Sequence, residues 1–375
     1  MNLSLTEEQN LIKSSAEKYF SEKFSFEKRQ KYLQLKNNKK ELLKNSKEFG
    51  WLALPFKSKY GGLDGDITDV MTLIEVFGGA LSLDPYIFTL LLPGLVIEEF
   101  CSEEKKQIYL NKILEGSESF SFCFAEPHQR FNFLNIKSDI IIKNEKYILN
   151  GKKKLVIGAD KSDHIIIPVK DNSDNILLFL ANNKNDVFSK IYKTIDDFHA
   201  ADYEFNNLEL EQTNLLCSLP YTDYAKKIEY IMDYITLAGC SDALGVIEKM
   251  YSLTIDYIKN REQFGKKIAS FQIIQHRMVD MYIKKEEMRS LNYMGQLSFN
   301  KQTKDNDRKK NVSLNKIFLA SHAKNIAQDC IQLHGGMGVA NEMQIGHCFK
   351  RLTAMCSLFG NLDFHYQRYS ENDLI

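Results

Sequence analysis

The chain divides into three stretches that differ in the period of their hydrophobic residues. From Thr6 to about Glu118, apolar residues recur at the spacing of three and four that places them on one face of a helix. Breaks fall at Pro55 and at Gly61-Gly62, residues at which helices commonly end. The first stretch therefore predicts a domain made of helices.

The second stretch, from Ser119 to about Leu216, contains short runs of β-branched and aromatic residues, which are typical of strands. The runs are Phe120–Phe124, Ile140–Ile142, Tyr147–Leu149, Leu155–Ile157, Ile165–Ile167 and Ile176–Leu180. Turn residues separate them, as at Asn150-Gly151 and Asp171–Asp174. Because no helix-length segment intervenes, we expect a β-barrel or sandwich rather than βαβ units.

In the third stretch, from about Tyr221 onward, the helical period returns. It predicts helices over Leu237–Ile258, Phe271–Met294 and Val312–Leu333, and the polar segment Asn300–Asn311 is expected to be an exposed connection. These helices suit a four-helix-type bundle. The predicted fold is α+β, with a helical domain at 1–118, a β-domain at 119–216 and a helical bundle at 217–375.

Charge and cysteine content exclude several classes of function. Among 375 residues, 49 Lys and Arg balance 49 Asp and Glu, so we expect no nucleic acid and no anionic membrane surface as a partner. The seven cysteines form no CxxC pair and show no regular spacing, which argues against a zinc site and against a disulfide framework. We therefore expect no metal and a reducing compartment.

The start of the chain does not resemble a targeting signal. Residues Met1 to Glu8 are polar and lack the basic start and apolar core of a signal peptide. The most apolar early run, Tyr86–Ile97, is shorter than the ~20 residues that a membrane helix needs. We expect a cytoplasmic protein.

Two motifs about seventy residues apart carry the chemistry. The first is Tyr257–Ile268, which contains Arg261-Glu262-Gln263-Phe264-Gly265 and is followed by Phe271-Gln272; the second is Gln332–Gly338, which contains two adjacent glycines. No predicted strand precedes the second motif, so it does not fit a Rossmann dinucleotide site.

In this order the two motifs resemble the acyl-CoA dehydrogenase family. Gly50–Ala53, Tyr60–Leu63, Glu126-Pro127, Asn150-Gly151 with Lys153, and Asp163 fall where that family has similar residues, so the resemblance covers essentially the whole chain. It implies α,β-dehydrogenation of an acyl-CoA thioester with FAD. It also implies a tetramer that passes electrons to an electron-transferring flavoprotein.

The resemblance assigns FAD to residues of both motifs. The expected cofactor-binding residues are Arg261, Gln263, Phe264, Gln272, Gln332, Gly335 and Gly336. A guanidinium suits a pyrophosphate in charge and geometry, and an aromatic ring offers a flat face. Glycines let backbone amides approach the adenosine and phosphate part closely.

Elsewhere the chain departs from the family pattern around the flavin ring. A threonine usually precedes the Glu-Pro pair and a serine follows it, both donating hydrogen bonds to the flavin. This chain has Ala125, and no serine near Phe131. A Trp-Ile-Thr segment that lies against the ring is replaced by Leu155-Val156-Ile157.

The catalytic base is also missing from its usual position. Where many members have Tyr-Glu-Gly-Thr, this chain has Leu358-Phe359-Gly360-Asn361, and a phenylalanine cannot remove a proton. Some members carry the base on the first bundle helix, at the position of Ile235 here. Asp233 is a weak candidate, because an offset of two residues turns a side chain about 200° around a helix. Glu342 and Asp363 are further carboxylates for which a structural role is expected.

The pattern of loss resembles the small or partner subunits of heteromeric acyl-CoA dehydrogenases. Examples of that group are the pimeloyl-CoA dehydrogenase small subunits and the paired subunits that act on steroid side-chain CoA thioesters. In family tetramers, the two motifs help to hold the FAD of a neighbouring subunit, and this chain keeps those motifs. We expect a second acyl-CoA dehydrogenase-like subunit in a heterotetramer. A homo-oligomeric, self-sufficient flavoenzyme with a relocated base and a non-catalytic scaffold are the alternatives.

Overall fold

A computed structural model describes residues 4–34, 45–143, 146–183 and 188–372. The chain forms two compact units. The first is made of residues 1–35, 66–82 and 236–375, and the second of residues 36–65 and 83–235. Each unit is described by itself below.

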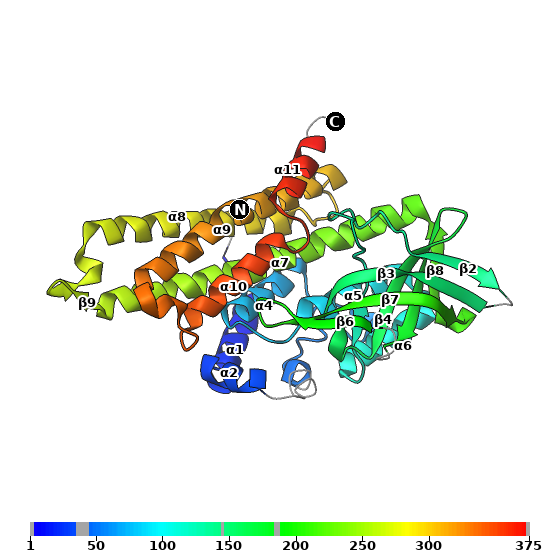
Figure 1. The fold of residues 1–375 in the computed structure, drawn as a ribbon, viewed down its shortest axis with the longest axis horizontal. Helices are drawn as coiled ribbons and strands as arrows, with labels where there is room; N and C mark the ends of the chain where they lie inside the picture. The colour runs from blue at the N-terminus through cyan, green and yellow to red at the C-terminus, as the bar shows by residue number, and fades with distance from the viewer. Residues whose placement is uncertain (1–3, 35–44, 144–145, 184–187, 373–375) are drawn as a thin grey trace. The chain divides into compact units, whose positions relative to one another are not determined.

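The first unit is helical, and its long helices form a bundle (Figure 1). Its elements are α1 (Glu7–Lys23), α2 (Phe26–Gln34), α4 (Ile67–Gly79), α7 (Tyr221–Asn260, in this unit from Thr236), α8 (Gln272–Leu297), α9 (Asp305–His334), α10 (Gln344–Ser357) and α11 (Leu362–Glu371). Helix α1 begins with a capping box in which Thr6 and Gln9 satisfy each other's backbone amides, the usual way to close a helix start.

Glycines and one buried ion pair bring α4, α7 and α10 together. A Cβ on Gly78 would lie 2.0 Å from the carbonyl oxygen of Asp242, and one on Gly245 would lie 1.8 Å from that of Glu75. Only glycine permits this approach of the α4 and α7 backbones. The Arg351 guanidinium of α10 donates to both carboxylate oxygens of Asp242, at 3.0 and 3.1 Å.

The second unit contains an eight-stranded sheet in the order β6-β7-β3-β2-β4-β5-β8, with β1 paired to β4. The strands are β1 (Phe120–Phe122), β2 (Asp139–Lys143), β3 (Lys146–Ile157), β4 (His164–Lys170), β5 (Asn175–Asn182), β6 (Phe188–Lys193), β7 (His199–Leu210) and β8 (Leu215–Pro220). Pairing is antiparallel except between β4 and its neighbours β1 and β2. The same unit contains the π-helical turn η2 (Ile87–Leu91) and helices α5 (Leu92–Phe100) and α6 (Glu103–Glu115).

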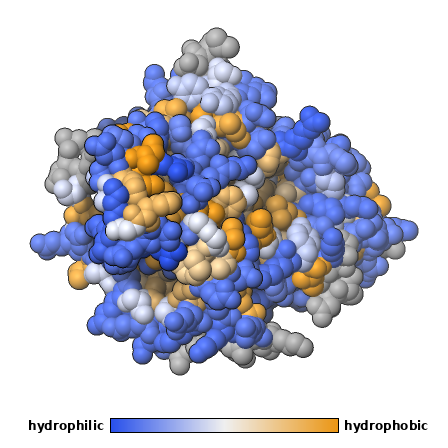
Figure 2. Space-filling model, turned by 60° about the vertical axis from the view of Figure 1, so that its left-hand side comes forward, coloured by the Kyte–Doolittle hydropathy of each residue, from blue (hydrophilic) through white to orange (hydrophobic). Residues whose placement is uncertain are grey.

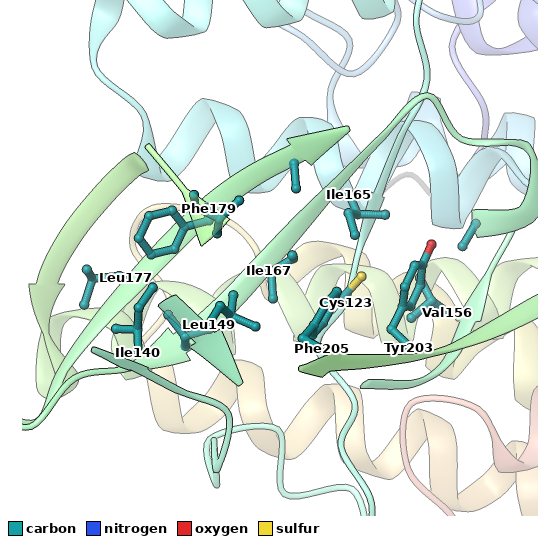
Figure 3. Close-up of a cluster of buried hydrophobic side chains, with 14 of the residues drawn as sticks. Cys123, Ile140, Leu149, Val156, Ile165, Ile167, Leu177, Phe179, Tyr203 and Phe205 are labelled. Carbon is teal, nitrogen blue, oxygen red and sulfur yellow. The ribbon is translucent and has the colours of Figure 1, made fainter. Parts of the chain in front are cut away.

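Buried hydrophobic side chains hold this sheet together (Figure 3). Ile165, Ile167 and Val169 alternate along β4 and are fully buried, as expected for one face of a strand. Phe179, Tyr203 and Phe205 add aromatic bulk from β5 and β7. Burial of this apolar surface is what stabilises the sheet.

The structure confirms the predicted α+β architecture of helical domain, β-domain and helical bundle. Two local predictions were wrong. Residues 305–311 are not a connection but the start of α9, where Asp305 and Asp307 favour the helix N-terminus by their charge. Asn150-Gly151 is not a turn but lies inside β3, where the register with β7 shifts at a bulge.

The surface of the molecule is mixed. None of the helices in the described part of the chain combines the length and apolar character needed to cross a bilayer. Hydrophobic side chains nevertheless interrupt a mostly hydrophilic face (Figure 2). Along α8, Ile273, Val279 and Ile283 are all more than 45% exposed, so part of the bundle surface is apolar.

Candidate functional site

The first motif forms a tight hairpin immediately after α7. Strand β9 (Glu262–Gln263) pairs antiparallel with β10 (Lys266–Lys267), and the two residues between them, Phe264 and Gly265, have φ angles of +54° and +74°. Two residues with positive φ are typical of a type I′ turn. The Phe264 side chain is 91% exposed and only meets Phe271 edge-on, with the ring centroids 6.2 Å apart.

The conformation of Phe264 is unfavourable within the chain. A left-handed conformation costs a non-glycine residue roughly 1–2 kcal/mol, and this exposed ring gains little burial in return. Strained, exposed aromatic residues are commonly found where another molecule binds.

The second motif lies at the end of α9. The helix stops at His334, and Gly335, with φ +59°, donates its N–H to the carbonyl of Gln332. A Cβ on Gly335 or Gly336 would have no heavy atom within 4 Å among the described residues. Gly336 has no positive φ either, so neither packing nor backbone conformation requires glycine there.

A groove connects the two motifs. It has a volume of about 440 Å³ and is lined by Leu253, Asp256, Tyr257, Asn260, Arg261, His334, Met343, Gln344 and Ile345. The rings of Tyr257 and His334 stack at 4.4 Å, and His334 Nδ1 lies 2.8 Å from the Cys330 carbonyl. The structure therefore brings Arg261 and the residue before Gly335 to one groove.

The other predicted cofactor residues are also exposed. Gln263, Gln272 and Gln332 all lie on the surface of the unit. A surface of exposed amides, one guanidinium and open glycine backbone fits a planar, anionic ligand that approaches from outside the chain.

The loop containing Phe359 is held rigidly between α10 and α11. The Phe359 ring packs on the helix face at Gly239 of α7, since a Cβ there would lie 3.4 Å from its Cδ2 atom. His365 Nε2 lies 3.1 Å from the Phe359 carbonyl, and a Cβ on Gly360 would lie 2.4 Å from the same nitrogen. Gly360, with φ +120°, is therefore required by both space and conformation.

A relay of hydrogen bonds fixes the tautomer of His365. Arg368 donates to the Ser313 hydroxyl at 3.3 Å, and this hydroxyl lies 3.3 Å from His365 Nδ1. The relay is satisfied when Ser313 donates to Nδ1 and the Nε2 proton is donated to the Phe359 carbonyl. Burial, together with the nearby charges of Lys316 and Arg368, lowers the pKa of His365 to about 3, so the ring is neutral.

Two buried carboxylates, Glu126 of the second unit and Asp242 of the first, are already engaged. Glu126 accepts from the Lys153 ammonium at 2.6 Å and from the backbone amides of Lys137 and Ser138. Asp242 is bound by Arg351, as described above. A carboxylate held by a cation is a weak base, because protonation would break the pair.

The remaining candidate carboxylates are Asp233, Glu342 and Asp363. Asp233 is 2% exposed on α7, and Ile235, two residues further along the helix, is fully buried. The helix turns about 200° between these two positions. Glu342 and Asp363 are exposed.

The segment expected to face the flavin ring offers an apolar surface without hydroxyl groups. Val156 and Ile157 belong to the buried core, while Leu155 is 40% exposed and has φ +51°. The carbonyl of Ala125 accepts from the Lys154 amide at 2.9 Å. These side chains provide no hydrogen-bond donor to a flavin ring.

Sequence models of two parts of one family match this chain. The N-terminal domain of acyl-CoA dehydrogenase matches residues 6–117, and the C-terminal domain of acyl-CoA dehydrogenase matches residues 231–371. A probable acyl-CoA dehydrogenase of Bacillus subtilis, YngJ, is 25% identical over 356 residues, covering 91% of each chain.

Solved structures show the same fold over the whole chain. A chain in the structure of the electron transferring flavoprotein of Acidaminococcus fermentans superimposes with a TM-score of 0.90 at 24% identity, covering 100% of both chains. A chain of the ChsE4-ChsE5 complex from Mycobacterium tuberculosis gives a TM-score of 0.88 at 18% identity, covering 100% of this chain and 99% of that one.

The matching family models and relatives, together with the fold, define a flavoprotein oxidoreductase with a helical bundle. The chain belongs to the acyl-CoA dehydrogenase family. This assignment confirms the class predicted from the sequence, that of FAD-dependent oxidoreductases acting on CH–CH bonds.

Several structural features of the site were not predicted. The sequence indicated neither the pairing of Glu126 with Lys153 nor the contact of His365 with Phe359. It also gave no sign of the ion pair between Asp242 and Arg351, which are 109 residues apart. Such pairs lack a local signal, because the two residues come together only when the fold is complete.

Proposed function

We propose that this chain is the partner subunit, lacking the usual base, of a heteromeric acyl-CoA dehydrogenase. The observation that carries the proposal is the contrast between two surfaces. One is the motif surface, which is formed by the exposed residues of the two motifs around Arg261 and Gly336 and is open and polar. The other is the loop at Phe359, which is apolar there and is held in place by a contact with His365. The ChsE4-ChsE5 complex, whose fold this chain shares, is itself an assembly of two proteins.

In the proposed assembly, this chain holds the adenosine and pyrophosphate end of a FAD whose flavin ring lies in the partner subunit. The Arg261 guanidinium, exposed at the end of α7, binds pyrophosphate oxygens with charge-assisted hydrogen bonds. Phe264 covers a planar part of the cofactor, and Gly335 and Gly336 leave backbone amides accessible to it. Bound FAD supplies the acceptor for the β-hydrogen of the acyl group.

The proton chemistry belongs to the partner subunit in this proposal. Removal of the α-proton of an acyl-CoA needs a positioned base, which typically contributes 10²- to 10⁴-fold to a rate. Phe359 offers no such group, and its ring fills the space beside Gly239. Electrons are then passed to an electron-transferring flavoprotein.

The test is to compare the purified chain alone with the chain co-expressed with a second acyl-CoA dehydrogenase-like protein that has an intact glutamate. We expect no dehydrogenase turnover and little FAD with the chain alone, and both properties in the co-purified complex. Turnover is measured with a series of acyl-CoA thioesters and an artificial electron acceptor. Strong turnover by the pure, lone chain would overturn the proposal.

If the lone chain shows activity, a pair of variants distinguishes a relocated base in this chain from a contaminating dehydrogenase. If the lone chain is active through Asp233, Asp233→Asn abolishes that activity, and Asp280→Asn, an exposed aspartate on α8, leaves it unchanged. Loss of activity in the first variant alone would identify a self-sufficient enzyme.

A further inference from the structure

The first unit contains a second cavity that the proposed function does not use. Its volume is about 500 Å³, within the ~300–1,000 Å³ typical of small-molecule sites. It is formed by α1 and the start of α2 on one side and by α4, α7 and α10 on the other; the residues are Lys13, Glu17, Phe20, Ser21, Phe24, Ser25, Phe26, Glu75, Val76, Gly79, Ala80, Gly245, Glu248, Lys249, Ser252 and Gln344.

The close crossing of α4 and α7 forms one side of this cavity. A Cβ on Gly79 would lie 3.1 Å from the Gly245 carbonyl, so the two helices meet with no side chain between them. The opposite side is aromatic. Phe20 and Phe24 are buried and meet edge-on, with their ring centroids 6.0 Å apart.

Two of the acidic residues in the cavity wall are neutralised by one arginine. Arg289 of α8 donates to Glu75 at 2.8 Å and to Glu248 at 2.9 Å. Glu248 also accepts from Lys285 at 2.8 Å. These cations lower the pKa of Glu248 against the effect of its partial burial, so the carboxylate stays ionised and engaged.

The two lysines of the cavity are not neutralised in this way. Lys13 on α1 and Lys249 on α7 are both half-buried, and within the described ranges neither makes an ion pair or a side-chain hydrogen bond. They belong to opposite walls, so both can reach one anionic group placed between them. Ser252 and Gln344 add neutral polar groups on the α7 and α10 side.

The remaining acid, Glu17, limits the charge of a suitable ligand. It is exposed at the rim on the same helix as Lys13. Its charge opposes a dianion such as a phosphate monoester more strongly than a single carboxylate. A carboxylate also has two oxygens, one for each ammonium group.

We infer that this cavity binds an amphipathic monocarboxylate, with the carboxylate between Lys13 and Lys249 and the apolar body against Phe20, Phe24 and Phe26. This cavity adjoins the groove between the two motifs, with which it shares Gln344, and its ligand goes beyond the proposed dehydrogenase role. Its ligand is a free acid, which lacks the thioester and nucleotide parts of an acyl-CoA.

The test is isothermal titration calorimetry of the full chain with sodium decanoate below its micellar concentration. We expect saturable binding with one site per chain. Lys249→Met is expected to weaken binding at least tenfold, whereas Lys249→Arg keeps it within about threefold, since an arginine restores the cation. Lys18→Met, which removes an exposed lysine of α1 outside the cavity, serves as the control and leaves affinity unchanged.

Two comparisons distinguish the carboxylate site from simple hydrophobic binding. Methyl decanoate, which has the same chain without a charge, is expected to bind at least tenfold more weakly. Decanoate affinity is also expected to fall with increasing salt. Equal binding of the acid and its ester, unchanged affinity of Lys249→Met with an unchanged melting temperature, or no binding of decanoate would each overturn the inference.

Discussion

Phe264 and Gly336 have properties that contacts within the chain do not explain. Phe264 combines a left-handed backbone with a 91% exposed ring, and Gly336 is a glycine at a position with neither a tight contact nor a positive φ. Both become understandable if another molecule approaches the backbone and the ring. At the scale of single residues, the motif surface is therefore the strongest support for a binding role.

Another residue, Asp84, gives a prediction about stability and pH. It is buried and accepts from the Ser46 hydroxyl at 2.9 Å, and burial raises its pKa from 3.8 to about 6. Because the folded pKa is the higher one, the neutral acid stabilises the fold below pH 4, and this contribution is lost as the pH rises through 6. Ionised Asp84 then costs up to about 3 kcal/mol at pH 8, the equivalent of two pKa units.

We therefore expect Asp84→Asn to be more stable than the wild type at pH 8 and close to it at pH 4. The free energy of unfolding is measured by urea denaturation at both pH values. Asp280→Asn, which changes an exposed aspartate, is the control and should show no such difference. A stability change for Asp84→Asn that is equal at both pH values would contradict this account of Asp84.

At the scale of elements, the segment from α10 to α11 acts as one rigid unit. The relay from Arg368 through Ser313 and His365 ends at the Phe359 carbonyl, and the buried Lys316 ammonium donates to the Met355 carbonyl at the end of α10. The loop that carries a base in other family members is thus held in one conformation.

Replacing His365 by leucine should destabilise this segment. The change removes the His365 donor to the Phe359 carbonyl and the His365 acceptor of the Ser313 hydroxyl, at about 1–3 kcal/mol for each lost partner. With two such losses, we expect the free energy of unfolding to fall by about 2–6 kcal/mol. Tyr366→Leu, at an exposed position next to it on α11, should change stability by less than about 0.5 kcal/mol. If both variants are equally stable, the relay does not hold the loop.

The sequence predicted the bundle helices well and several strands poorly. The bundle helices were found because a period of 3.6 persists over more than twenty residues at α8 and α9. Strands β6, β7 and β8 were missed, since none of them has a run of β-branched residues, and β6 and β7 also mix charged with apolar types. Asn150-Gly151 has a strong turn signal, but pairing of β3 with both β2 and β7 overrides it.

The site was predicted less completely than the fold. Arg261, Phe264 and Gly336 were predicted because they lie in contiguous motifs, and the structure brings Arg261 and the end of α9 to one groove. The roles of Arg289 and His365 depend on contacts between helices distant in the sequence. No local pattern encodes these contacts, because they form only when the helices pack together in the fold.

At the scale of the whole molecule, the proposed function makes the chain part of a larger assembly. The motif surface faces outward, and α8 carries the exposed apolar residues Ile273, Val279 and Ile283. In a heteromeric complex, both are available to a partner and its FAD.

The most direct test of this account is the FAD content of the purified mixed complex with wild-type or Arg261→Glu chain, measured as the ratio of flavin to protein absorbance. We expect the charge reversal to reduce FAD occupancy at least fivefold without preventing assembly, whereas Lys18→Glu, at an exposed position on α1, has no effect. A complex of Arg261→Glu that keeps full FAD occupancy would contradict the central claim that this chain holds the cofactor of its partner.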